Sequence, residues 1–192
     1  MIALTRIFGS IFLLALLTAQ TVQAETPQVS LRGKALTLQG QTIQVGQPLP
    51  DIALPDTGLT MRPLRAFNGK VTILSVVPSI DTPTCEEQTH ILSEKNDGLD
   101  ASANLITVSR DLPFAQKRFA KEAKIHNLTF LSDYRDAAFG KNMGLLIEEN
   151  RLLARAVMVL DKDGIVRYLE VVSELSQLPA MAKAFETARG LL

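Results

Sequence analysis

Residues 71–94 read VTILSVVPSIDTPTCEEQTHILSE and predict a buried strand followed directly by a helix. The opening VTILSVV is apolar and rich in β-branched side chains, the pattern of a strand covered on both faces of a sheet. Pro78 should end that strand, because proline has no N–H to give to a sheet. Two glutamates follow Cys85, where a helix N-terminus favours negative charge, so Cys85 is expected in the first turn of the helix.

The same alternation of strands and helices continues along the chain. Beyond this segment we expect strands at 104–108 and 128–131, helices at 114–124, 137–142 and 178–192, and a hairpin formed by 154–161 and 165–172. Before it, residues 29–46 alternate apolar and polar side chains between glycines and predict a β-hairpin, and residues 47–58 are expected to form an extended connector. The predicted class is α/β, with a thioredoxin-like mixed sheet flanked by helices and an N-terminal β-hairpin.

Composition limits the classes of partner. The 192 residues carry 20 Lys plus Arg and 20 Asp plus Glu, so no net charge attracts the protein to nucleic acid or to an anionic membrane surface. Hydrophobic residues make up 46% and charged residues 21%, the balance of one ordinary globular domain. Tryptophan is absent and aromatic residues make up only 5%, which argues against an aromatic platform for bases or sugars and favours a small substrate.

The N-terminal segment has the pattern of a targeting sequence. MIALTR carries a positive charge, IFGSIFLLALLTA is apolar, and Val22-Gln23-Ala24 places small residues where a signal peptidase cleaves. The apolar run is shorter than the roughly 20 residues of a membrane-spanning helix, so a signal peptide is favoured over an uncleaved anchor. We therefore expect a signal peptide at 1–24, an exported domain at 25–192, and no stable membrane insertion after cleavage.

Cys85 is the one cysteine of the chain, so no intrachain disulfide can form. The presence of a single unpaired cysteine, taken alone, favours a buried, inert thiol, because free cysteine is among the most buried residue types. Its place at the start of a helix favours the opposite, because free N–H groups and the helix dipole stabilise an anionic sulfur. Thr82 could donate its hydroxyl to that sulfur or to a substrate oxygen, and Pro78 could shield the pocket from water.

Residues 78–85, PSIDTPTC, resemble the peroxiredoxin signature, in which proline, threonine and cysteine follow one another at this spacing. Together with SRDLPFAQKRF at 109–119 and ARAVMVLD at 154–161, they resemble the thiol peroxidase branch of that family. The resemblance implies that Cys85 attacks the peroxide, Thr82 hydrogen-bonds it, Pro78 shields the pocket and Arg155 completes the site. It also implies a peroxidase that needs no metal or organic cofactor, which in an exported protein indicates the bacterial periplasm.

One position departs from the family pattern. Many thiol peroxidases carry a resolving cysteine directly after the RF of the 109–119 string, and here that position is Ala120. We therefore expect a one-cysteine cycle in which an external thiol, either a small molecule or a thioredoxin-like protein, reduces the sulfenic acid. Family resemblance further suggests a homodimer. Leu112, Phe114 and Leu146 are expected near the pocket, where they would allow alkyl hydroperoxides as substrates beside hydrogen peroxide.

Three alternatives remain open from the sequence. The protein could be a peroxide sensor that passes its oxidation to a partner, or an inactive thioredoxin-like interaction domain. A cysteine hydrolase that pairs Cys85 with His126 is less favoured, because no matching nucleophile motif is present. His90 lies roughly 140° around the predicted helix from Cys85 and should face away from the sulfur.

Overall fold

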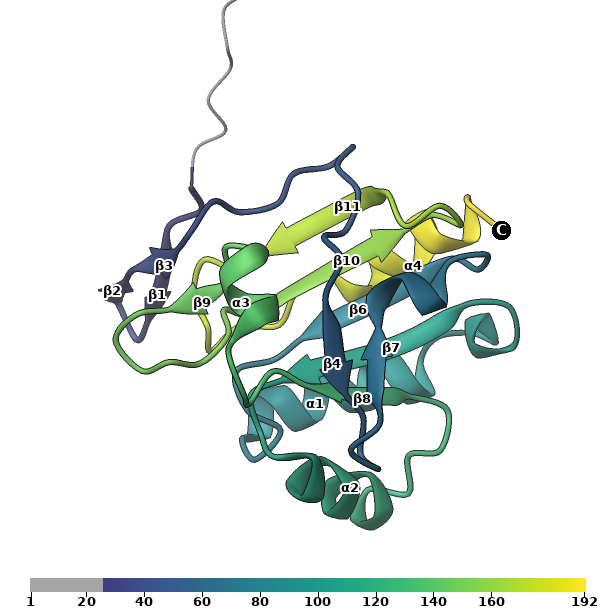
Figure 1. The fold of residues 1–192 in the computed structure, drawn as a ribbon, viewed down its shortest axis with the longest axis horizontal. Coiled ribbons are helices and arrows are strands. Elements are labelled where there is room, and N and C mark those ends of the chain that lie inside the picture. The colour runs from purple at the N-terminus through teal and green to yellow at the C-terminus, as the bar shows by residue number, and fades with distance from the viewer. Residues whose placement is uncertain (1–25) are drawn as a thin grey trace, which may run out of the picture.

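The computed structural model describes residues 26–192 and centres on a five-stranded mixed sheet (Figure 1). The strand order is β11-β10-β6-β7-β8, in which β6 runs parallel to β7 and antiparallel to β10. The strands are β6 (Thr72–Val76), β7 (Asn104–Ser109), β8 (Thr129–Ser132), β10 (Ala156–Leu160) and β11 (Val166–Val171). The predicted strands and the predicted C-terminal hairpin are confirmed, and the expected signal peptide at 1–24 lies outside the described residues.

Helices cover both faces of the sheet. Helices α1 (Pro83–Glu94) and α4 (Met181–Arg189) pack on one face, α3 (Ala138–Asn142) lies over the other, and α2 (Pro113–Glu122) contacts the edge strand β8 (Figure 1). The expected thioredoxin-like arrangement is confirmed. No helix within residues 26–192 has the length and apolar character needed to cross a membrane.

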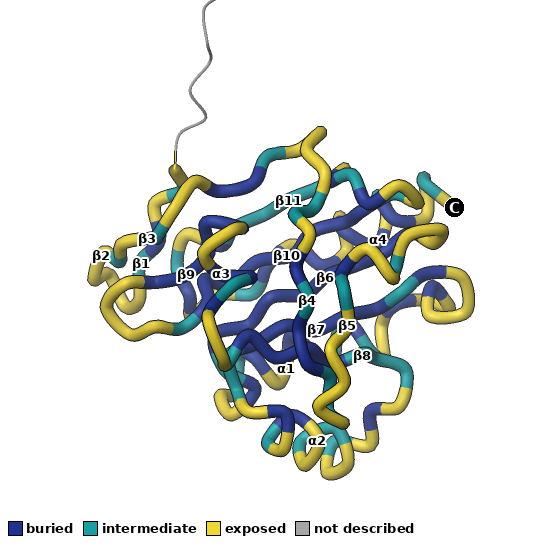
Figure 2. Tube along the Cα trace, in the orientation of Figure 1, coloured by how far each residue is buried: buried dark blue, intermediate teal, exposed yellow. Residues whose placement is uncertain are grey.

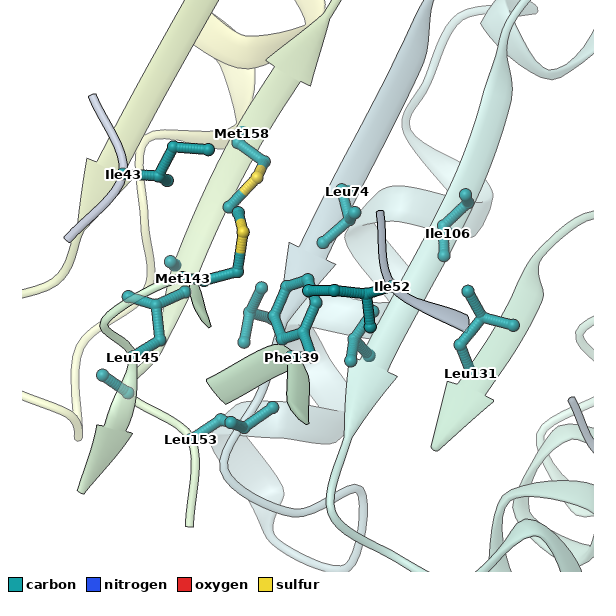
Figure 3. Close-up of a cluster of buried hydrophobic side chains, with 14 of the residues drawn as sticks. Ile43, Ile52, Leu74, Ile106, Leu131, Phe139, Met143, Leu145, Leu153 and Met158 are labelled. Carbon is teal, nitrogen blue, oxygen red and sulfur yellow. The ribbon is translucent and has the colours of Figure 1, made fainter. Parts of the chain in front are cut away.

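The strands divide their side chains between two apolar cores. Leu74, Ile106 and Met158 belong to the core that contains Phe139 of α3, and Figure 3 shows Met158 beside Met143 in this cluster. Their sequence neighbours on the same strands, among them Ile73 and Leu105, point instead toward α1 and α4. Because successive strand residues face opposite sides, a sheet covered on both faces needs continuous apolar runs. This explains why the central strands are buried throughout (Figure 2).

Short paired strands surround the main sheet. The N-terminal hairpin predicted over 29–46 is confined to 29–36, where β1 (Val29–Leu31) and β2 (Lys34–Leu36) pair across a turn in which Arg32 and Gly33 both have positive φ. Strand β3 (Leu38–Gln39) pairs with β9 (Leu146–Ile147), and two 3-10 helices, η1 (Leu64–Phe67) and η2 (Leu99–Ala101), flank the sheet.

The expected connector at 47–58 is in part a second hairpin. Strand β4 (Ala53–Pro55) pairs antiparallel with β5 (Met61–Pro63). Between the strands, the carboxylate of Asp56 accepts N–H bonds from Gly58 and Thr60 and closes the turn. The sequence did not predict this pairing, because three-residue strands that contain proline show too little alternation of apolar and polar side chains.

Candidate active site

Cys85 lies in the first turn of α1, as predicted. The helix begins at Pro83, whose missing N–H is harmless at that position, and Thr82 precedes it with an extended backbone. The carbonyl oxygen of Thr82 accepts N–H bonds from Cys85 at 3.0 Å and from Glu86 at 2.9 Å. The strand β6 and the loop 77–82 therefore deliver the cysteine to the N-terminal end of the helix dipole.

Cys85 is fully buried in an apolar pocket. Val77 and Ile80 contact it from the loop after β6, and Phe119 of α2 packs against the same cluster. Pro78 is buried in the loop that follows β6, and β6 ends at Val76, which confirms the predicted end of the strand. The sulfur consequently has little contact with bulk water.

Arg155 brings a buried positive charge to the sulfur. This residue directly precedes β10 and is only 2% exposed. Its Nη2 lies 3.4 Å from Cys85 Sγ, and its Nε donates to the carbonyl oxygen of Leu175 at 2.9 Å. Because a guanidinium stays charged in proteins, a full positive charge lies against the sulfur.

Gln88 holds the other side of the guanidinium, and the sequence interpretation missed it. Its Oε1 accepts from Nη1 of Arg155 at 2.8 Å, and its Nε2 donates to Ser75 Oγ at 2.8 Å. Residues three positions apart share a helix face, so its spacing from Cys85 could have suggested this role. Gln88 is fully buried and joins α1, β6 and Arg155 in one network.

Asp111 fixes the loop that carries Pro78, and it too was missed. Its carboxylate accepts from Ser79 Oγ at 2.7 Å and from the N–H of Ile80 at 2.8 Å. Asp111 follows β7, which is parallel to β6, so the ends of both strands meet at one edge of the sheet. Asp111 lies in the 109–119 string directly after a predicted strand, so the meeting of these strand ends was the sequence signal that could have indicated its role.

Thr82 lines a cavity of about 330 Å³ beside the buried cysteine. Its hydroxyl donates to the carbonyl oxygen of Ser79 at 3.4 Å, and no bond from it to the sulfur occurs in the described structure. The structure therefore places Arg155 beside Cys85 and buries Pro78 in the loop after β6, while Thr82 lines a cavity that shares Ile80 and Phe119 with the surroundings of the cysteine. The other lining residues are Ile80, Asp81, Pro83, Glu86, Phe119, Glu122 and Ala123.

The apolar residues expected around the pocket are elsewhere. Leu112 and Phe114 are 51% and 63% exposed at the start of α2, and Leu146 is fully buried in β9. Ile80 and Phe119 supply the apolar lining instead. This expectation was wrong because the sequence does not show toward which neighbouring element an apolar side chain points, whether it lies before a helix, in its first turn or in a short strand.

Comparison with known proteins identifies the family. A family model described as Redoxin matches residues 44–185. The thiol peroxidase of Bacillus subtilis is 42% identical over 165 residues, which cover 86% of this chain and 98% of that protein. The chain belongs to the peroxiredoxin family, in its thiol peroxidase branch.

Further relatives agree with this assignment. A thiol peroxidase of Streptococcus pneumoniae is 44% identical over 85% of this chain and 99% of its own length. The solved structure of a peroxiredoxin-like protein from Aquifex aeolicus superposes with a TM-score of 0.80 at 34% identity, covering 86% of this chain and 97% of that one. The chain is accordingly a thiol-dependent peroxidase with a thioredoxin-like fold.

Acidic side chains surround the cavity of this peroxidase. Asp81, Glu86 and Glu122 all line it and are exposed. A molecule that approaches the cysteine through this cavity therefore meets negative charge first.

His90 does not face the sulfur, as expected, since its Nδ1 lies 2.6 Å from Glu94 Oε1 on the outer side of α1.

Proposed function

We propose that Cys85 reduces hydrogen peroxide or an organic hydroperoxide in a one-cysteine cycle assisted by Arg155. The observation that carries this proposal is the 3.4 Å contact between Arg155 Nη2 and Cys85 Sγ inside a buried pocket. A positive charge and a helix N-terminus both stabilise a thiolate, which is the nucleophilic form of cysteine. Arg155 also keeps one N–H of Nη2 with which to hold a peroxide oxygen, since its other four N–H groups are directed to Leu175, Thr84, Gln88 and Cys85.

The first half of the cycle oxidises the sulfur. The thiolate of Cys85 attacks the nearer peroxide oxygen, so an S–O bond forms as the O–O bond breaks. The departing oxygen takes a proton and leaves as water or as an alcohol, and the sulfur becomes a sulfenic acid. Arg155 stabilises the negative charge that grows on the departing oxygen. The peroxide thereby gains two electrons and the sulfur loses two.

Pro78 and Thr82 support this step. Buried Pro78 shields the sulfur without introducing an N–H that would lack a partner. Thr82 lies at the cavity, where its hydroxyl exchanges the carbonyl of Ser79 for the incoming peroxide. Because the bond to that carbonyl is long, at 3.4 Å, breaking it requires little free energy.

The second half of the cycle uses two external thiols. The chain has no second cysteine and carries Ala120 where many relatives have a resolving cysteine. One thiol attacks the sulfenic acid and forms a mixed disulfide as water leaves. A second thiol releases Cys85 in its reduced form and departs as part of the external disulfide. A small thiol or a thioredoxin-like protein can supply both equivalents.

Export and dimerisation complete the proposal. The charged, apolar and small-residue segments of residues 1–24 support secretion into the bacterial periplasm. Family resemblance supports a homodimer, and the exposed apolar side chains of Leu112 and Phe114 are surface that a second subunit would cover. Sedimentation of the wild-type protein and of Phe114→Glu tests the dimer: a monomeric wild-type protein at micromolar concentration would exclude it.

Peroxide consumption with a small thiol tests the enzymatic proposal. We expect wild-type protein to turn over, Cys85→Ser to be inactive, and Arg155→Lys to be slower because a lysine lacks the planar fork of donors. A wild-type protein that forms a sulfenic acid but is not turned over by any external thiol would instead support the sensor alternative.

A further inference from the structure

We propose that the N-terminal hairpin β1–β2 is a positioning device for Arg155, held in place by Glu174. The proposal rests on the role proposed for Arg155 in the reaction. It assigns the hairpin a task in catalysis, although the hairpin lies outside the main sheet and contributes no side chain to the cysteine pocket. The connection runs through the backbone of the loop 173–176, which follows β11.

The first link is the carboxylate of Glu174, which binds the tip of the hairpin. It accepts the N–H of Arg32 at 2.9 Å, the N–H of Gly33 at 3.1 Å and the hydroxyl of Ser30 at 3.1 Å. The backbone N–H groups of Arg32 and Gly33 lower the pKa of this carboxyl from 4.5 to about 2. Glu174 is thus held as a carboxylate by the turn that it binds.

The second link joins the backbones of hairpin and loop. The N–H of Ser30 donates to the carbonyl oxygen of Ser173 at 2.7 Å, and the N–H of Leu175 donates to the carbonyl oxygen of Ser30 at 2.8 Å. The side chains of Leu175 and Val29 are buried in the same apolar core. Leu175 is consequently fixed by its N–H and by its side chain, which leaves its carbonyl oxygen in a defined place.

The third link is the carbonyl oxygen of Leu175, which accepts from Nε of Arg155 at 2.9 Å. The other contacts of the guanidinium are with α1, through Gln88 Oε1, the carbonyl oxygen of Thr84 and Cys85 Sγ. Leu175 is therefore the one hydrogen-bond partner of the guanidinium, within the described residues, that does not belong to α1. When the loop moves, the guanidinium loses the contact that sets its angle toward the sulfur.

Glu174 is accordingly a positioning residue: it touches neither the sulfur nor Arg155. A control exists in Glu149, an exposed glutamate that also binds a backbone N–H, that of Thr37 directly after β2. Glu149 has no hydrogen bond to the loop 173–176 among the described residues. Substitution of Glu149 therefore weakens an anchor of the same region without disturbing Leu175.

A double-mutant cycle tests the proposal. The second-order rate of sulfenic acid formation at Cys85 is measured with hydrogen peroxide in wild-type protein, Glu174→Ala, Arg155→Ala and the double variant, and in the control Glu149→Ala. We expect Glu174→Ala to slow the wild-type reaction by roughly tenfold, about the effect of losing one well-placed hydrogen bond to a charged group. In the Arg155→Ala background the same substitution should change the rate by less than about twofold.

Three results would overturn the proposal. Equal slowing by Glu174→Ala in both backgrounds would mean that the effect does not pass through Arg155. If Glu174→Ala reacts with peroxide no more slowly than Glu149→Ala does, its lower rate reflects only a weakened structure around the hairpin. A rate for Arg155→Ala equal to that of wild-type protein would remove the proposed role of Arg155 itself, and this outcome is visible before Glu174 is considered. Rescue of the rate by Glu174→Gln, which keeps one acceptor oxygen, would support the positioning role.

Discussion

The substitution Gln88→Leu removes the acceptor that holds Nη1 of Arg155 while it keeps the approximate volume of the side chain. The bond lost is 2.8 Å long, fully buried and made to a charged donor. Hydrogen bonds to charged groups contribute about 1.5–3 kcal/mol. If most of that free energy orients the guanidinium in the transition state, the peroxide reaction should slow by roughly tenfold to a hundredfold.

Competition against a reference peroxidase measures this rate, and Thr89→Val provides the control. Thr89 is also buried on α1, but its hydroxyl donates only to the carbonyl oxygen of Cys85, and it has no bond to Arg155. Thr89→Val should therefore keep the peroxide rate within about twofold of wild type, since only a local helix contact is lost. A folded Gln88→Leu variant with the wild-type rate would refute the argument that the position of Arg155 limits the reaction.

Three further predictions follow from the charges and the residue types of the site. Anionic thiols should reduce the sulfenic acid a few-fold more slowly than neutral thiols at low ionic strength, because the cavity is lined by acidic side chains. Single-turnover rates for wild-type protein and Glu122→Gln check this prediction. An unchanged difference in rate between the two kinds of thiol in the variant would contradict it. The substitution Ala120→Cys should restore a resolving thiol, so that peroxide produces an intramolecular disulfide instead of a stable sulfenic acid. Mass spectrometry distinguishes the two products. A persistent sulfenic acid would show that position 120 cannot reach Cys85. The pKa of Glu174 is lowered from 4.5 to about 2 by the N–H groups of Arg32 and Gly33, so its carboxylate stabilises the fold above pH 4.5 and loses this effect as the pH falls toward 2. The difference in Tm between wild-type protein and Glu174→Gln should shrink over that range, and a constant difference would contradict the assignment.

The strand and helix around Cys85 were predictable because their signals are local. An apolar run, a proline and two glutamates define β6 and the start of α1 within 24 residues, 71–94. The C-terminal hairpin was equally clear, since two apolar strands flank an Asp-Gly turn. The prediction that Arg155 lies beside Cys85 came from family resemblance, because no periodicity links residues 70 positions apart.

The remaining parts of the site depend on contacts that sequence patterns do not encode. Gln88 and Asp111 are polar residues on otherwise ordinary segments, and their roles come from partners on other elements. The contact of Arg155 with Leu175 uses a backbone carbonyl, which any residue at that position would supply. The direction of Leu112 and Phe114 was set by the packing of α2 against β8, which needs the complete fold.

The most direct test of the account is the intact mass of the protein after a brief, stoichiometric pulse of peroxide in the presence of a sulfenic acid trap. The account predicts rapid trapping of one oxidised sulfur in wild-type protein, none in Cys85→Ser and much slower trapping in Arg155→Ala. A wild-type thiol that stays reduced through the pulse would contradict the central claim that Cys85 and Arg155 together form a peroxide-reducing site.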